Sequence, residues 1–273
     1  MTEKRGRVFS FGGGVQSHAV MVLQAQGKLD RPYDAFIFAN VGEDSENPDT
    51  LAYLERYTKP FAEEHNITLL EVRKKGRTVR EQAMRSDLRS VVIPAYKGKG
   101  GATHRTCTTD WKIEQVDKAI RVLQYTHCEI GLGISYDEPT RIRSEEWADR
   151  YVSVSGKTEK LFGFWKKREY VLFHMGITRL ACNRIIGEAG LPQPPKSSCY
   201  FCPFRKPREW LAMKIEDPSL FGKAIEVEDA LNNKGLPGDP YFLHTYKKPL
   251  AEAVSDQQML PMDLECEDGY CNT

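Results

Sequence analysis

A run of three glycines, Gly12, Gly13 and Gly14, constrains this chain more than any other feature, because it separates a strand-like stretch from a helix-like one. The apolar residues of 8–11 predict a strand, and those of 19–23 predict a helix. Glycines let backbone N–H groups approach an anion without a Cβ in the way, and the helix directs its positive N-terminal end at the same place. The loop of residues 10–17 is therefore predicted to bind a phosphate, and an ordinary strand-to-helix turn is the alternative.

Strands and helices alternate after this loop, and their order predicts the fold class. A continuous apolar run at 35–39 predicts a strand, a helical pattern follows at 49–65, and 68–72 predicts a third strand. A β-α-β-α-β order is typical of an α/β fold in which a parallel, twisted sheet has helices on both faces. Ligands of such sheets bind at the carboxyl ends of the strands, which is where the glycine loop lies.

The remaining pattern predicts a strand at 129–134 and helices at 77–86, 109–123, 178–189, 207–215 and 220–232, with short strands as candidates at 152–154 and 161–164. Residues 165–168 interleave an aromatic side chain with cations and are interpreted as a solvated, charged turn, with contact to nucleic acid or a cofactor as the alternative. We expect residues 1–175 to form a nucleotide-binding α/β domain. Residues 176–273 are expected to form a helical, cysteine-bearing C-terminal part with a tail.

Composition limits the partners and the compartment. The formal net charge of +1 does not indicate wholesale electrostatic binding to nucleic acid, although a local basic patch stays open. No apolar run approaches the ~20 residues that cross a membrane, and the charged residues 1–5 have no apolar region behind them, unlike a signal peptide. We expect a cytoplasmic protein without a membrane partner. Its seven cysteines then indicate metal ligands, catalytic thiols or buried thiols rather than disulfides.

The cysteine spacing indicates a metal or redox site. The pair Cys199-x-x-Cys202 can bring two sulfurs onto one centre, so a metal would need further ligands from elsewhere. Cys107 precedes a predicted helix and lies near Arg105, which favours its thiolate, whereas a small buried apolar role is the alternative. An iron–sulfur cluster, a zinc ion and a redox dithiol all stay open on these residues.

Two other segments follow predicted strands. Arg141 and Arg143 come after the strand at 129–134, and their forked donors suit a phosphate or a sulfate, with a solvated charged turn as the alternative. Asn40 and Gly42 follow the strand at 35–39, where a backbone turn can face an adenine or a ribose. An ordinary strand-to-helix connection is the alternative there.

In order, these segments resemble the phosphoadenylylsulfate (PAPS) reductase family of the adenine nucleotide α-hydrolase, or PP-loop ATP pyrophosphatase, superfamily. The glycine loop is similar to the pattern Ser-x-Gly-Gly-x-Asp-Ser, with Gln16 in place of the acidic residue. Residues 38–50, 105–113 and 131–143 are similar to the family's next segments, and Ser135 replaces an arginine of the last one. The resemblance covers most of residues 7–204.

The resemblance implies a nucleotide site and a metal centre. The nucleotide would be ATP, adenylyl sulfate or its 3′-phosphate (PAPS). The residues that would hold it are Ser10, Gly12, Gly13, Gly14, Gln16, Ser17, Asn40, Gly42 and Arg143. The family's four-iron, four-sulfur cluster would take Cys107, Cys199 and Cys202, with Cys182 as our candidate for the fourth ligand and zinc as the competing metal. A glutamine at position 16 cannot hold a magnesium ion as a carboxylate would.

Two chemistries follow from the resemblance. In ATP-dependent sulfur transfer, the charge of Arg141 would stabilise the transition state. In sulfonucleotide reduction, Cys266 in the tail would attack the sulfate sulfur, with an inert surface thiol as its alternative role. A thiol reductant or sulfur donor would be a partner, while a nucleic-acid acceptor and a homo-oligomer are left open. From another class, the chain would be a non-catalytic nucleotide- or nucleic-acid-binding module with a structural zinc site.

Overall fold

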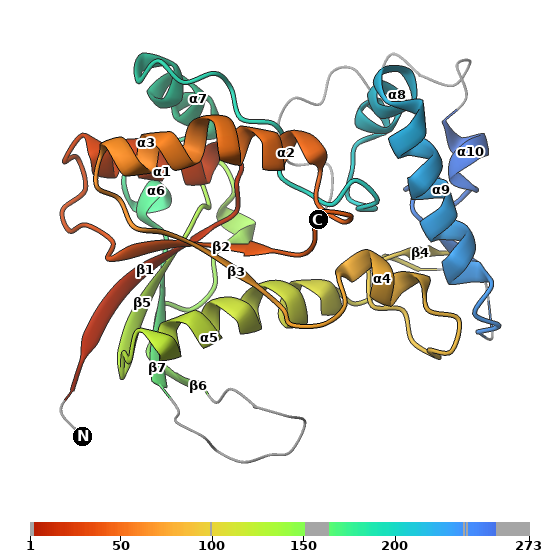
Figure 1. Ribbon diagram of the computed structural model, residues 1–273, viewed down its shortest axis with the longest axis horizontal. Helices are drawn as coiled ribbons and strands as arrows, with labels where there is room; N and C mark the ends of the chain where they lie inside the picture. The colour runs from red at the N-terminus through yellow and green to blue at the C-terminus, as the bar shows by residue number, and fades with distance from the viewer. Residues whose placement is uncertain (1–2, 99, 151–163, 237, 239, 255–273) are drawn as a thin grey trace. The chain divides into compact units, whose positions relative to one another are not determined.

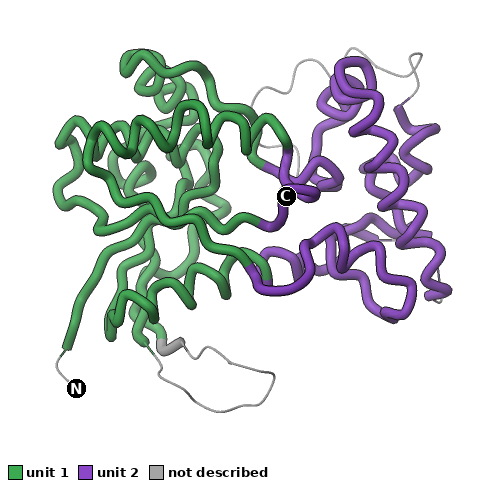
Figure 2. The backbone as a smooth tube through the Cα atoms, viewed as in Figure 1, with its two compact units in different colours: residues 1–40, 48–73, 111–197 green, residues 41–47, 74–110, 198–273 purple. Residues whose placement is uncertain are grey.

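The computed structural model describes residues 3–98, 100–150, 164–236, 238 and 240–254. The chain divides into two compact units (Figure 2). Unit 1 contains residues 1–40, 48–73 and 111–197, and unit 2 contains residues 41–47, 74–110 and 198–273. The division is discontinuous in sequence, because the chain passes from unit 1 to unit 2 after residues 40, 73 and 197.

A six-stranded sheet forms the centre of unit 1. Its order is β3 (Leu69–Arg73), β2 (Ala35–Asn40), β1 (Arg5–Phe11), β5 (His127–Leu132), β7 (Phe164–Glu169) and β6 (Ala148–Arg150). The first five strands are parallel, and β6 runs antiparallel to β7. The predicted α/β class is confirmed. The order of the strands reverses beside β1, which pairs with β2 on one side and β5 on the other, and such a switch point leaves a crevice at the carboxyl ends.

Helices cover both faces of this sheet (Figure 1). One face carries α1 (Val15–Ala25), α3 (Lys59–Glu64), α6 (Val171–His174) and α7 (Arg179–Glu188). A π-helical turn, Leu54–Thr58, joins α3 to α2 (Pro48–Tyr53). The other face carries α5 (Glu114–Val122), which continues a π-helical turn at Thr108–Ile113. Alternate residues of β1 and β2 therefore enter two different apolar cores, with Phe9 and Phe36 in one and Val8 and Ile37 in the other.

Residues 165–168 belong to β7, so the prediction of a charged turn is wrong. β7 pairs in parallel with β5, and its Lys166 lies opposite Cys128. The Lys166 ammonium contacts both carboxylate oxygens of Asp117 on α5, at 2.9 and 3.1 Å, and that carboxylate is buried. The Lys166 charge is therefore paired against α5, whereas Arg168 is exposed.

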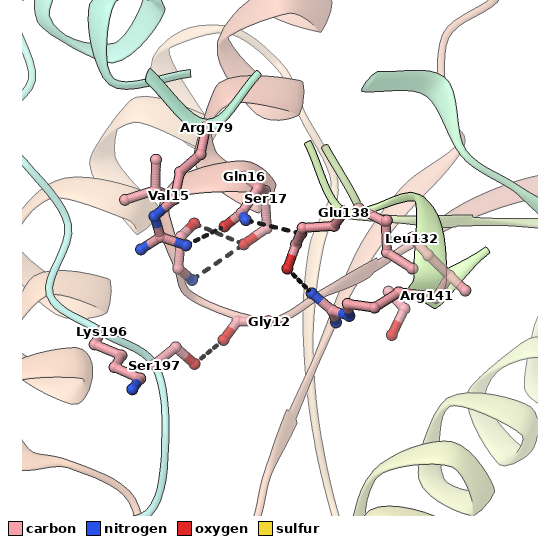
Figure 3. A pocket seen from close by; sticks show the side chains of 14 residues that line it. Gly12, Val15, Gln16, Ser17, Leu132, Glu138, Arg141, Arg179, Lys196 and Ser197 are labelled. Atoms are coloured by element: carbon pink, nitrogen blue, oxygen red, sulfur yellow. Dashed lines mark hydrogen bonds and ion pairs between the residues drawn. The ribbon is translucent and has the colours of Figure 1, made fainter. Parts of the chain in front are cut away.

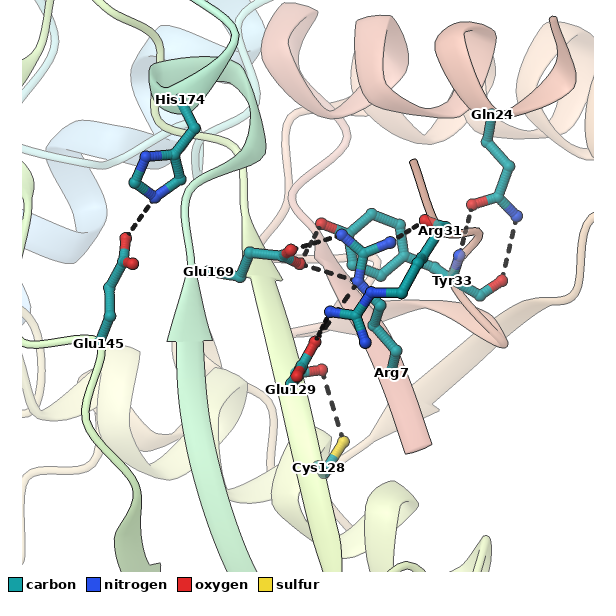
Figure 4. Close-up of polar contacts among 9 residues, drawn as sticks. All are labelled: Arg7, Gln24, Arg31, Tyr33, Cys128, Glu129, Glu145, Glu169 and His174. Carbon is teal, nitrogen blue, oxygen red and sulfur yellow. Dashed lines mark hydrogen bonds and ion pairs between the residues drawn. The ribbon is translucent and has the colours of Figure 1, made fainter. Parts of the chain in front are cut away.

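A polar network ties β1, β5 and β7 together on the opposite side from this pair (Figure 4). The Arg7 guanidinium donates to Glu169 at 3.0 Å and lies over the Tyr33 ring, whose hydroxyl donates to the same carboxylate at 2.8 Å. Arg31 pairs with Glu129 at 2.5 Å. Burial raises the pKa of Tyr33. Two arginines and two glutamates balance one another here, which suits a structural cross-link between strands.

Unit 2 is mainly helical. It contains α4 (Val79–Met84), α8 (Pro207–Glu216), α9 (Pro218–Asn232) and α10 (Leu250–Ala253), with β4 (Tyr96–Lys97) antiparallel to β8 (Tyr241–Phe242). Trp210 and Phe221 contact each other edge to face in its core. The buried Glu228 carboxylate accepts two backbone N–H bonds at 2.6 Å. None of the helices in the described part of the chain combines the length and apolar character needed to cross a bilayer.

Candidate functional site

A pocket of about 460 Å³ lies in unit 1 at the carboxyl ends of β1 and β5, the switch point of the sheet. Its size is within the usual range for a small-molecule site. It is lined by Ser10, Gly12, Gly14, Val15, Gln16, Ser17, Leu132, Gly133, Ile134, Glu138, Arg141, Arg179, Lys196 and Ser197. The glycine loop thus forms one wall, and residues from later segments of the chain form the rest.

The glycine loop ends β1 and begins α1. Gly14 caps the helix, and the Ser17 hydroxyl both donates to the Gly14 carbonyl at 2.8 Å and accepts from the Gly14 N–H at 3.1 Å. Gly13 has φ +75°, and a Cβ there would lie 3.1 Å from the Thr50 methyl group. Only glycine fits this turn without strain, and the turn brings the positive end of an 11-residue helix to the pocket.

Four side chains form a continuous polar chain across the pocket (Figure 3). Arg179 donates to the Gln16 amide oxygen at 3.2 Å, and the Gln16 NH₂ group donates to Glu138 at 3.2 Å. Arg141 pairs with the other oxygen of Glu138 at 2.5 Å. Together with Lys196, the pocket has three cationic side chains and one carboxylate, which favours an anionic ligand.

Local structure fixes both partners of Gln16. Arg179 is the first residue of α7, whose N-cap Thr178 accepts from the Ala181 N–H at 3.3 Å. The Asp137 carboxylate accepts from the Arg179 backbone N–H at 3.1 Å. Glu138 follows β5 and also accepts from the Ser135 hydroxyl at 3.3 Å. Ser135 therefore orients a carboxylate in the pocket.

His18 supports the glycine loop from behind. Its Nδ1 lies 2.9 Å from the Gly14 carbonyl oxygen, and its Nε2 lies 2.7 Å from the Thr58 hydroxyl. The ring is packed edge to face against Phe11 and Tyr53. Burial lowers the pKa of His18 to about 4, so the imidazole is neutral at physiological pH.

The structure adds Glu138, Arg179, Lys196 and Ser197 to the residues that sequence reasoning placed at the phosphate loop. The Ser197 hydroxyl donates to the Gly12 carbonyl, which holds residues 196–197 against the loop. A sequence signal exists for Lys196 and Ser197, which belong to a Lys-Ser-Ser run just before the Cys-x-x-Cys pair.

Other predicted nucleotide residues lie elsewhere. Gly13 shapes the loop without lining the pocket, and the Asn40 amide donates to Glu71 at 2.7 Å. Gly42 belongs to unit 2, where its φ of +124° serves a tight turn. Arg143 is exposed, and its guanidinium donates to two carbonyls of its own turn at 2.8 and 2.9 Å. Among the predicted arginines, Arg141 therefore lines the pocket and Arg143 does not.

The Cys199-x-x-Cys202 pair forms a tight turn in unit 2, with the Cys202 N–H donating to the Cys199 carbonyl at 3.0 Å. Arg205 closes the turn by donating to the Tyr200 carbonyl at 3.0 Å. Cys107 belongs to the same unit, and all three thiols are half-buried. Among the described residues, no group of three or more histidine, cysteine, aspartate and glutamate side chains is arranged to hold a metal ion. An iron–sulfur cluster and a zinc ion on these thiols therefore stay predictions.

Cys182, the predicted fourth ligand, is a core residue of unit 1. It is fully buried on α7 in the apolar cluster that includes Phe9 and Phe11. Burial raises the pKa of the Cys182 thiol to about 12, so the thiolate that a metal requires is disfavoured. This corrects the predicted ligand set. The predicted nucleophile Cys266 lies outside the described residues.

Comparisons with known proteins give a distant likeness of fold. No family model and no curated protein matches the chain. Among solved structures, the phosphoadenylyl-sulfate (PAPS) reductase from Candida auris, in a phosphate complex, matches 69% of this chain and 75% of that chain. The two are 12% identical, with a TM-score of 0.39. A likeness at this level says nothing about activity, so the function has to be argued from the pocket.

Proposed function

We propose that the chain is an enzyme that binds an adenine nucleotide through its phosphates and carries out sulfur transfer or sulfonucleotide reduction. The pocket is the observation that supports nucleotide binding. In it, a glycine loop, a helix N-terminus and three cationic side chains meet at the switch point of a parallel sheet. Backbone N–H groups and guanidinium groups are the donors that phosphate and sulfate accept. The proposal that the nucleotide carries adenine and that the reaction involves sulfur is based on the sequence motifs.

Each pocket residue has a role in this proposal. The loop of residues 10–17 holds a phosphate, and Lys196 adds a point charge beside it. Arg141 is exposed on one side and able to exchange Glu138 for an anionic oxygen, so it would neutralise charge that develops on the leaving group. An iron–sulfur cluster or a zinc ion on the cysteines of unit 2 stays a prediction, and none of these roles depends on one. The sulfur would come from, or leave to, an external thiol or a sulfur donor, and a nucleic-acid acceptor stays open.

Calorimetric titration with ATP, adenylyl sulfate and PAPS tests the binding. We expect at least one to bind, and Arg141→Gln to weaken it by about tenfold, since a hydrogen bond to a charged group contributes about 1.5 kcal/mol. Arg143→Gln is the matched control, because it removes a charge from the same turn outside the pocket lining. No binding, or equal losses in both variants, would contradict a phosphate site here.

Product analysis then separates the chemistries. Release of sulfite from a sulfonucleotide in the presence of a dithiol indicates reduction, and release of pyrophosphate from ATP indicates adenylation before sulfur transfer. Nucleotide binding without either product would instead favour the non-catalytic module.

A further inference from the structure

We propose that a cluster of aromatic rings in unit 1 binds single-stranded nucleic acid by stacking with its bases. The cluster, which we term the aromatic edge, consists of His127, Trp147 and Trp165. His127 and Trp165 lie at the amino ends of β5 and β7, and Trp147 immediately precedes β6, whereas the pocket lies at the carboxyl ends of β1 and β5 (Figure 1). None of the three residues lines the pocket, so the aromatic edge is a second surface.

Trp165 differs from the tryptophans of the two cores because much of it is exposed. It is 45% exposed, whereas Trp111 and Trp210 are buried. Its ring is nearly parallel to that of His127, with 12° between the planes and 6.4 Å between the centroids. The Trp147 ring meets His127 edge to face, at 5.4 Å between centroids. A base that stacked on the exposed part of Trp165 would therefore extend a set of rings that is already ordered.

The sheet fixes the position of these rings and places a cation beside them. His127 lies opposite Trp165 in the β5–β7 register, and Arg5 lies opposite His127 in the β1–β5 register. The three side chains therefore form one row across three strands, about 10 Å long at the usual strand spacing. The Arg5 side chain is 69% exposed and pairs with the exposed Glu3 at 2.8 Å. An exposed ion pair of this kind contributes little, so a phosphate can replace Glu3 on the guanidinium.

Two further cations lie next to this row. Lys167 is on the same face of the sheet as Trp165, because side chains alternate along β7, and it lies opposite Glu129. Arg31, whose side chain is 63% exposed, pairs with Glu129. The network of Figure 4 already balances two arginines with two glutamates, so Lys167 adds a positive charge to this face.

Rings and cations together select the class of ligand. Aromatic side chains that stack bases, beside cations that bind the phosphate backbone, are the means by which proteins bind single strands without sequence preference. In a duplex the bases are stacked on one another, so their faces are not free for Trp165. A neutral sugar or an apolar protein surface would use the rings and gain nothing from Arg5, Arg31 or Lys167. The formal net charge of +1 means that charge alone supplies little affinity, and the rings have to supply the rest.

Fluorescence anisotropy of the full chain with a labelled oligothymidylate of about 12 nucleotides tests the proposal. An abasic strand and a duplex of the same length are the comparison ligands, since both carry the phosphates without free base faces. We expect the oligothymidylate to bind about tenfold or more tightly than either. Equal affinity for the abasic strand would show binding of a polyanion only and overturn the proposal. Absence of oligothymidylate binding at about 100 μM protein would also overturn it and favour a protein partner for the rings.

Three variants locate the bound strand. Trp165→Ala should weaken oligothymidylate binding by about ten- to a hundredfold, and Trp165→Phe, which keeps a ring, should stay within about threefold of the parent. Tyr136→Ala is the matched control, because Tyr136 is an aromatic residue, 54% exposed, that follows the carboxyl end of β5. Its affinity should equal that of the parent. No loss in Trp165→Ala, or equal losses in the Trp165 and Tyr136 alanine variants, would refute the assignment.

The salt dependence separates the rings from the cations. For single strands, log K falls with log salt by about 0.7 for each phosphate contact. Arg5→Gln should therefore reduce the slope by about 0.7, whereas Trp165→Ala should lower the affinity and leave the slope unchanged. A slope that Arg5→Gln does not change would contradict the phosphate contact at this row. These outcomes do not depend on whether the pocket at the opposite edge binds a nucleotide.

Discussion

Protonation of His18 should loosen the glycine loop and unit 1 with it. The folded state holds the pKa of His18 at about 4, mainly through burial, against 6.5 for an ordinary histidine. As the pH falls below 6.5, the unfolded chain takes up a proton that the folded chain does not accept until about pH 4. Stability is therefore complete above pH 6.5 and is lost as the pH falls through this window. The full difference corresponds to about 3 kcal/mol, of which about 2 kcal/mol is lost by pH 5.

Urea unfolding at pH 7 and pH 5 measures this loss. Cys182 reports on the same unit, because its thiol is buried in the core cluster that contains Phe11, against which the imidazole packs. A brief thiol-labelling pulse at alkaline pH, read by mass spectrometry, therefore gives the fraction of unit 1 that is open at each urea concentration. In His18→Gln, whose amide can still donate to the Gly14 carbonyl, the loss between pH 7 and pH 5 should be smaller by about 2 kcal/mol.

All other titrating groups are common to the two proteins, so the difference between their pH dependences isolates position 18. A lower stability of His18→Gln at pH 7 would not affect this difference. If both proteins lose the same free energy between pH 7 and pH 5, the imidazole is not held neutral by its surroundings and the reasoning is wrong.

Three further changes have expected outcomes. Gly13→Ala should cost about 1–2 kcal/mol in urea unfolding, because φ is +75° and the new Cβ meets a threonine methyl, whereas Gly12→Ala, whose Cβ meets nothing within 4 Å, should stay within about 0.5 kcal/mol. Lys166→Met should cost about 3 kcal/mol, because it takes the ammonium from the buried Asp117 carboxylate. The Cys182 thiol should resist a disulfide reagent in the folded protein while the half-buried thiols of the Cys-x-x-Cys turn react, and prompt labelling of both kinds would contradict the burial.

The strand, glycine loop and helix at the start of the chain could be predicted because their signal is local. Three glycines between a strand and a helix specify the backbone of residues 10–17 whatever the rest of the chain does. The partners of Gln16 could not be predicted in the same way, because Glu138 and Arg179 lie 122 and 163 positions away. Neither residue belongs to a pattern with a defined spacing to the loop. The strand order, which places β5 beside β1, brings Glu138 to Gln16, and the packing of α7 against α1 brings Arg179 there.

The predictions for Cys182 and for residues 165–168 show a different limitation, because an assignment was made from local sequence alone. Cys182 was assigned from its place before a proline run, but the apolar period of α7 turns it into the core beneath α1. Residues 165–168 were assigned by their charge, but a strand can carry a lysine whose ammonium is paired on a neighbouring helix. In both cases the residue type was compatible with the predicted role, but the side chain points to a different place from the one that the role requires. That direction depends on packing between elements that are distant in sequence.

The interpretation of Gln16 changes once its partner Glu138 is known. If only the glycine loop is considered, an amide in place of a carboxylate removes a metal ligand. Taken with Glu138, it is the residue that lets a carboxylate approach within 3.2 Å, since two carboxylates at that separation would repel each other unless a cation or a proton lay between them. The pocket still contains a carboxylate, that of Glu138, which follows β5 and pairs with Arg141. The charge that residues 16 and 138 present together would therefore decide whether a metal or a guanidinium meets a bound phosphate.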